Sequence, residues 1–75
     1  MAINCGTLEK VEHFKGSVND IYTAKLVYQN RKFNITYDCK ENNLIIHEWY
    51  KLTKDEINNI TNELTNYFMH LQNVA

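Results

Sequence analysis

Apolar and polar residues alternate along the middle of the chain, and this pattern predicts β-strands. In the segment Ile21 to Tyr28, one face carries Tyr22, Ala24, Leu26 and Tyr28, while Val27 is the apolar exception on the other face. The segment Lys32 to Cys39 alternates more regularly, with one face formed by Phe33, Ile35, Tyr37 and Cys39. Period-two alternation indicates strands with one buried face, so we expect these two segments to form an antiparallel hairpin.

The register of this hairpin is predicted by pairing apolar residues with apolar residues. With Asn30 and Arg31 as the two turn residues, Tyr28 lies opposite Phe33, and the other apolar residues pair in turn on the same face. A slip by one residue would place them on opposite faces.

The segment Leu44 to Tyr50 is apolar on both faces and predicts the next strand. Its register depends on the turn formed by residues 40–43. A loop of two or four residues directs Leu44 and Ile46 to the core, and it leaves on the opposite face Ile45, His47 and Trp49. A three-residue loop reverses the two sets and turns Trp49 inward. The sequence leaves both registers open.

A C-terminal helix is predicted from its start signal and its apolar stripe. Thr53 and Glu56 have the spacing of a capping box, and Leu52 and Ile57 occupy the positions of a hydrophobic staple. The stripe at helical spacing consists of Ile57, Ile60, Leu64, Tyr67, Phe68 and Leu71. Met69 projects from the Asn-rich side, so we expect it to be exposed.

The segment Thr7 to Lys15 is compatible with two structures. Leu8, Val11 and Phe14 recur every three residues as in a short helix, but Val, His and Phe also suit a strand. The predicted fold is α+β: an antiparallel three- or four-stranded meander with one C-terminal amphipathic helix packed on one face. The order is ββββα, or αβββα if residues 8–15 are helical. A chain of 75 residues predicts a single domain, 1–75.

Charge and composition narrow the classes of function. The net charge is -1, with eight basic and nine acidic residues, which argues against a nucleic-acid module that depends on bulk positive charge. No apolar run approaches the roughly 18 residues of a membrane span, and no signal peptide is visible, so the expected location is cytoplasmic, without membrane contact. Eleven Asn, and seven Lys against one Arg, indicate AT-rich coding, which favours a phage or another mobile element as the source.

Metal-binding and catalytic patterns are weak. The potential metal ligands are Cys5, His13, Cys39, His47 and His70, and no two of them have the close spacing of structural zinc ligands. We therefore expect no metal and no cofactor, and two reduced cysteines. Ser17 is the only serine, and no Gly-rich phosphate loop is present, so no catalytic residue is predicted and the protein is expected not to be an enzyme.

Two alternative functions use charged residues. A nucleic-acid-binding regulator would use the cations Lys25, Arg31, Lys32, Lys40 and Lys51, with Trp49 and Tyr50 available for stacking on bases. A small ribonuclease would use His47 as its base, with Lys32 or Arg31 holding the phosphate.

The favoured hypothesis comes from apolar residues that one helix cannot cover. The residues predicted to bind protein are Ile45, His47, Trp49, Val27 and Met69. Alternatively, residues 1–14 fold over this surface. Because exposed Trp and Met are enriched at interfaces, we expect a small non-enzymatic protein-binding module. It would be a phage- or mobile-element-encoded inhibitor or regulator that acts by steric occlusion, or a homodimer.

Overall fold

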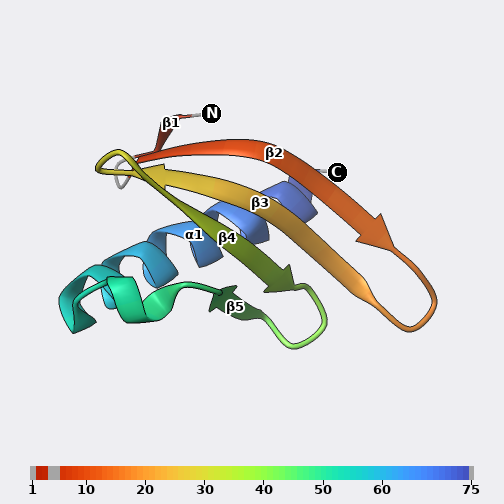
Figure 1. Cartoon of the computed structure of the whole chain (residues 1–75). Helices are drawn as coiled ribbons and strands as arrows, with labels where there is room; N and C mark the ends of the chain where they lie inside the picture. Colours follow the sequence, from red (N-terminus) through yellow and green to blue (C-terminus); the bar gives the residue numbers. More distant parts are fainter. Residues whose placement is uncertain (1, 4–5, 75) are drawn as a thin grey trace.

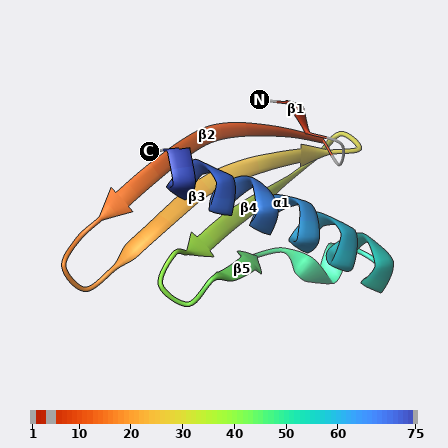
Figure 2. The same ribbon diagram turned by 180° about the vertical axis from the view of Figure 1, so that it is seen from behind.

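The chain folds into an antiparallel meander with one helix across one face of the sheet (Figures 1 and 2). The computed structural model describes residues 2–3 and 6–74. The elements are β1 (Ala2–Ile3), β2 (Gly6–Lys15), β3 (Asp20–Tyr28), β4 (Arg31–Asp38), β5 (Asn43–Ile46), the 3-10 helix η1 (Trp49–Lys51) and α1 (Lys54–Val74). Strands β2 to β5 followed by α1 confirm the α+β class and the ββββα order. The two-residue β1, paired with β2, was not predicted.

The first long segment is a strand, so the αβββα alternative is wrong. β2 pairs with β3 along its length, and Leu8 lies opposite Leu26 in the core. A β-bulge interrupts the ladder between Glu9 and Glu12, and Lys10 there has a φ of 53°. A bulge adds one residue and so reverses the alternation of faces beyond it. Of the three apolar residues whose spacing resembled a helix, Leu8 is buried and Val11 and Phe14 are exposed.

The β3–β4 hairpin has a register that differs by two residues from the prediction. Leu26 lies opposite Phe33, and Tyr28 lies opposite Arg31, so the turn residues are Gln29 and Asn30. These two have φ angles of 50° and 62°, as a type I′ turn requires. A shift of two residues keeps every side chain on its face, and for that reason the apolar pattern could not distinguish the two registers. The predicted turn at Asn30 and Arg31 is wrong.

The turn before β5 decides between the two registers that the sequence left open for this strand. Asp38 lies opposite Asn43, so the loop has four residues, 39–42, and it directs Leu44 and Ile46 toward the helix. The strand itself ends at Ile46. The predicted continuation of the strand to Tyr50 is wrong, because the chain turns at residues 47–48 and then forms η1.

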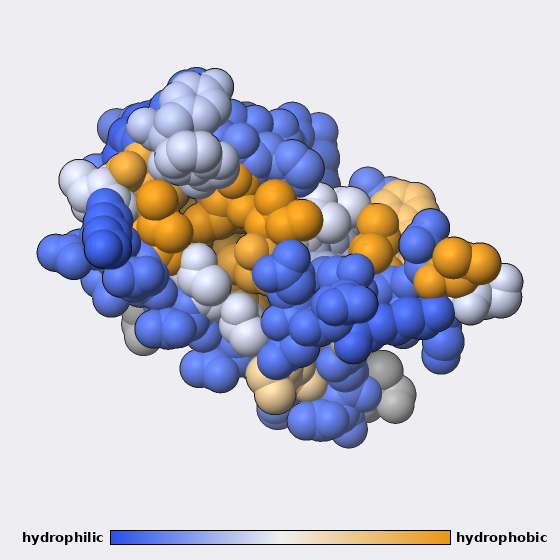
Figure 3. All heavy atoms as spheres, turned by 90° about the horizontal axis from the view of Figure 1, so that it is seen from below, coloured by the Kyte–Doolittle hydropathy of each residue, from blue (hydrophilic) through white to orange (hydrophobic). Residues whose placement is uncertain are grey.

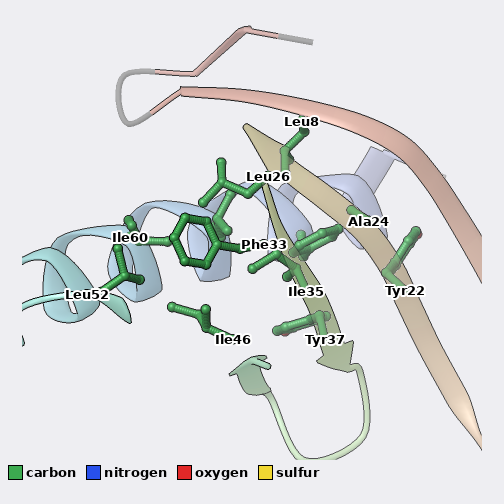
Figure 4. Close-up of a cluster of buried hydrophobic side chains, with 12 residues drawn as sticks. Leu8, Tyr22, Ala24, Leu26, Phe33, Ile35, Tyr37, Ile46, Leu52 and Ile60 are labelled. Carbon is green, nitrogen blue, oxygen red and sulfur yellow. The ribbon is translucent and has the colours of Figure 1, made fainter. Parts of the chain in front are cut away.

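The core lies between the inner face of the sheet and α1 (Figure 4). Its buried residues are Leu8, Tyr22, Ala24, Leu26, Phe33, Ile35, Tyr37, Ile46, Leu52, Ile60, Leu64 and Phe68. The Phe68 ring stacks on Tyr37 with 5.2 Å between the ring centroids. The predicted apolar stripe of α1 is confirmed, and Met69 is exposed as expected. Within the described part of the chain, no helix is long and apolar enough to cross a membrane.

The capping box at the start of α1 is confirmed. The Glu56 backbone N–H donates to Thr53 Oγ1 at 3.2 Å, and the Thr53 N–H donates to Glu56 Oε1 at 2.9 Å. Leu52 is buried and Ile57 packs against the core, as the hydrophobic staple predicts. The helix therefore begins where the chain leaves η1.

Replacing the cap tests how far α1 depends on it. Thr53→Ala is expected to reduce the free energy of unfolding by about 1 kcal/mol, because one N–H loses its partner at the helix start. Denaturant unfolding followed by far-UV circular dichroism measures this. Asn58→Ala, at an exposed position of the same helix, is the control and is expected to leave stability unchanged or slightly higher. Equal losses in both variants would contradict this role of the cap.

Candidate functional site

Strand β5 forms one edge of the sheet and leaves backbone groups without a neighbouring strand. Only β4 pairs with β5 within the described residues. The His47 N–H donates to the Asn34 carbonyl at 3.0 Å. Because hydrogen-bonded positions alternate along an antiparallel pair, Ile45 is the next residue whose N–H and C=O point to β4. The N–H and C=O groups of Leu44 and Ile46 therefore point away from the sheet.

An apolar groove lies beside this edge, between β5 and the first turns of α1. It has a volume of about 270 Å³, and it is lined by Asn43, Leu44, Ile45, Ile46, Trp49, Ile57 and Thr61. The view from below looks onto the β5 side of the sheet and shows an apolar area at its centre (Figure 3). Trp49 is 59% exposed and Ile45 42% exposed. We use the name β5 edge for these lining residues together with the backbone groups of β5 that point away from the sheet.

A carboxylate explains why β5 is short and why Trp49 lies at the surface. Glu48 Oε1 accepts the Asn34 backbone N–H at 2.7 Å, and Glu48 Oε2 accepts from Asn34 Nδ2 at 3.2 Å. The side chain of Glu48 thus accepts the Asn34 N–H to which a continued β5 strand would bind, and this ends the ladder between β4 and β5. The hydrogen bond from the Asn34 backbone lowers the pKa of the Glu48 carboxyl group, because it stabilises the charged form.

The residues predicted to bind protein do not form one patch. Ile45 and Trp49 line the same groove. His47 lies next to them in the sequence, and its Nε2 is 2.8 Å from Thr36 Oγ1 on the outer face of the sheet. Val27 pairs with Lys32 at the opposite end of β4, and Met69 lies on the outer side of α1. Of the predicted set, the structure brings together Ile45 and Trp49, and adds Leu44 and Ile57.

The N-terminal segment does not cover the outer face of the sheet within the described residues. β2 joins the edge of β3 instead, and Leu8 enters the core on the helix side. The outer face remains open and is mainly polar; its members include Glu12, Thr23, Lys25, Lys32, Asn34 and Thr36. The exposed apolar residues lie in two main places, at the β5 edge and at the β2–β3 hairpin, where Phe14 and Val18 are exposed. The predicted alternative of internal cover by residues 1–14 is wrong for the described part.

Of the five cations of the nucleic-acid alternative, Arg31 and Lys40 have hydrogen bonds within the protein. Arg31 donates to the Lys51 carbonyl at 2.9 Å, and its guanidinium lies 5.6 Å from the centre of the Phe33 ring. Lys40 Nζ donates to the carbonyls of Ser17 and Val18 in the β2–β3 loop. Lys25 pairs with Glu9 on the outer face, whereas Lys32 is exposed near the β3–β4 turn. Arg31, one of the two cations considered with His47 for a ribonuclease, thus holds η1 instead.

A cluster that was not predicted from the sequence lies where β2 ends, β3 begins and β4 ends. The side chains of His13, Asp20 and Cys39 offer ligand atoms that all lie within 4.8 Å of one another. The spacing rule compared only residues close in the sequence, whereas these three come from β2, β3 and the residue after β4. The signal that could have found them is the antiparallel pairing of the strands, which brings the end of β2, the start of β3 and the end of β4 to the same end of the sheet.

Comparisons with family models, with curated proteins and with solved structures found no match to this chain.

The two glutamates that end β5 and start α1 predict the acid response of the fold. Hydrogen bonds lower the pKa of both Glu48 and Glu56 from the usual 4.5, with the backbone N–H groups of Asn34 and Thr53 as the main causes. A lowered pKa in the folded state gives stability that is complete above about pH 4.5 and is lost as the pH falls through the folded-state value.

We therefore expect the free energy of unfolding to decrease below about pH 4.5, and Glu48→Gln and Glu56→Gln each to make this decrease shallower. Denaturant unfolding at a series of pH values measures the slope. Glu41→Gln, in the exposed β4–β5 loop, is the control. Unchanged slopes in the first two variants would contradict the assignment of these hydrogen bonds.

Proposed function

We propose that this chain is a protein-binding module that works by pairing strands at the β5 edge, and that its partner there is a second copy of the chain. The observation that carries the proposal is the outward direction of the Leu44 and Ile46 backbone groups beside an uncovered apolar groove. Addition of a strand at such an edge is an established mode of recognition, in which backbone hydrogen bonds supply affinity and apolar pockets supply specificity.

The edge is complementary to itself in one register. Leu44 and Ile46 are placed symmetrically about Ile45, so a twofold axis through Ile45 brings Leu44 of one copy opposite Ile46 of the other. These are the residues whose N–H and C=O groups point outward, and an antiparallel pair of this kind exchanges both hydrogen bonds. Centring the axis on Leu44 would require the left-handed Asn42 (φ 52°) to pair with Ile46, which breaks the strand.

Charge and composition also favour a second copy. Strand β5 reads Asn43-Leu44-Ile45-Ile46 and contains no charged residue and no proline. Proteins usually protect exposed edges with such residues, and an uncharged edge brings no like charges together when it meets its own copy. In the proposed register, Ile45 contacts the same residue of the other copy on the outer face.

The four-residue strand alone is too small for a stable interface. Specific protein interfaces usually bury about 1,200–2,000 Å² in total. The groove supplies the additional surface, since Trp49 and Ile57 line it next to β5, and exposed aromatic residues such as Trp49 are the type that dominate binding energies. The proposed interface therefore consists of the paired β5 strands with Trp49 at each end. Steric occlusion of another protein's surface by this module, and a phage origin, stay predictions from the sequence.

A charge placed at the twofold axis tests this proposal. Wild-type protein is expected to be a dimer in size-exclusion chromatography with light scattering over a dilution series. Ile45→Lys is expected to be a folded monomer, because two ammonium groups would face each other while the exposed position spares the core. Trp49→Ala is expected to weaken the dimer at least about tenfold, as loss of an interface anchor does.

Val18→Lys is the matched control, since Val18 is 78% exposed at the tip of the β2–β3 hairpin, away from the β5 edge. This variant is expected to dimerise like the wild type. A wild-type monomer at every concentration overturns pairing with a second copy. A dimer that survives Ile45→Lys overturns the β5 edge as the binding surface.

A further inference from the structure

Three side chains with metal-binding atoms meet where β2 ends, β3 begins and β4 ends. His13 belongs to β2, Asp20 is the first residue of β3, and Cys39 directly follows β4. Strand pairing places them together, because the Cys39 N–H donates to the Asp20 carbonyl at 2.9 Å and His13 lies opposite Tyr22. This arrangement has no part in the β5 edge.

The separations of the ligand atoms differ by about 1 Å from those of a tetrahedral zinc site. Zinc binds Cys sulfur at about 2.3 Å and His nitrogen or carboxylate oxygen at about 2.0–2.2 Å, which places neighbouring ligand atoms roughly 3.3–3.7 Å apart. The three ligand atoms here lie within 4.8 Å of one another. His13 Nε2 and Asp20 Oδ1 are 2.5 Å apart as a hydrogen-bonded pair. Entry of an ion would replace this hydrogen bond and separate the two atoms by about 1 Å, which rotations of exposed side chains can supply.

The positions of the ligands are partly fixed before any ion binds. The His13 ring stacks on the Tyr22 ring with 4.1 Å between centroids and an angle of 11° between planes. Tyr22 is itself buried in the core. Cys39 is held by its backbone hydrogen bond to Asp20. Because the ligands come from rigid strands, little ordering is needed on binding.

The cluster is open to solvent on one side. A pocket of about 260 Å³ lies there, lined by His13, Lys15, Asp20, Tyr22 and Gln72. The side chains of His13 and Asp20 are 36% and 25% exposed. An ion can therefore enter, and a fourth coordination position remains for water or for Gln72, which is hydrogen-bonded to the Cys39 thiol. The positive charge of Lys15 beside Asp20 opposes binding, whereas one thiolate and one carboxylate favour it.

We propose that His13, Asp20 and Cys39 bind a divalent ion of the zinc class. A ligand set of one thiolate, one imidazole and one carboxylate suits zinc and cobalt rather than magnesium or calcium, which prefer oxygen ligands alone. Binding forms a metal–sulfur bond and releases the thiol proton to solvent.

Cobalt(II) is the probe, because thiolate-bound tetrahedral cobalt absorbs in both the near-ultraviolet and the visible range. We expect titration of the reduced protein with CoCl₂ to give both bands at one equivalent and ZnCl₂ to remove them. Zinc is also expected to raise the midpoint of thermal unfolding, since an ion bound only by the folded state stabilises it.

Variants separate a site from general binding to thiols and imidazoles. Cys39→Ser is expected to abolish the near-ultraviolet band, and Asp20→Asn to weaken affinity by at least the roughly tenfold that even the loss of a partner that only orients a ligand costs. His13→Phe keeps a ring to stack on Tyr22 and removes the ligand, so its expected loss of binding is not a loss of fold, which circular dichroism checks.

His70→Ala and Cys5→Ser are matched controls and are expected to bind as the wild type does. Absence of the visible bands in the wild type would overturn the proposal. Retention of the near-ultraviolet band in Cys39→Ser, or its loss in Cys5→Ser, would overturn the assignment of the thiol. None of these results depends on the dimer at the β5 edge.

Discussion

The two hydrogen bonds between the Glu48 carboxylate and Asn34 determine the second half of the structure. They occupy the position where β5 would continue along β4, and so the strand ends after four residues. The chain then turns into η1, which leaves Trp49 at the surface and brings Leu52 into the core just before the capping box of α1. The Glu48 side chain thus ends the edge strand just before the exposed tryptophan, and the capping box of Thr53 and Glu56 starts the helix.

The single helix explains why the edge is the surface that remains. All buried side chains of the sheet lie on the face that α1 covers, and the opposite face is mainly polar. A small domain has little surface with which to cover further apolar residues. The apolar residues of β5 that do not reach the core, together with Trp49, therefore stay in contact with solvent beside backbone groups that no other described strand satisfies.

Alternation and capping signals were sufficient to predict the class of fold, the faces of β3 and β4, and the start of α1. They could not determine features that depend on backbone conformation or on distant contacts. Period-two alternation cannot distinguish registers that differ by two, and the left-handed pair Gln29-Asn30 decided between them. The three-residue spacing of Leu8, Val11 and Phe14 does not mark one face, since Leu8 is buried whereas Val11 and Phe14 are exposed.

The end of β5 and the cluster of His13, Asp20 and Cys39 could not be predicted from the sequence, for the same reason. Each is formed by residues on different strands, 14 positions apart in the case of Asn34 and Glu48, and only the register of the sheet brings them together. Of the predicted binding residues, Ile45 and Trp49 share a groove because they flank the point where the strand ends. Val27 was included because alternation places it on the outer face, and Met69 because it projects from the polar side of the helix; neither pattern determines the distance to β5.

The most direct test of pairing at the β5 edge is a cross-link at the proposed twofold axis. In the proposed register, Ile45 faces the same residue of the other copy in a pair that is not hydrogen-bonded, where Cα atoms lie about 4.5 Å apart, within the range of a disulfide. Mild oxidation of Ile45→Cys should therefore give a covalent dimer on a non-reducing gel, whereas the wild type and Val18→Cys should stay monomeric on the same gel. Equal cross-linking of Val18→Cys, or none in Ile45→Cys, would contradict the account.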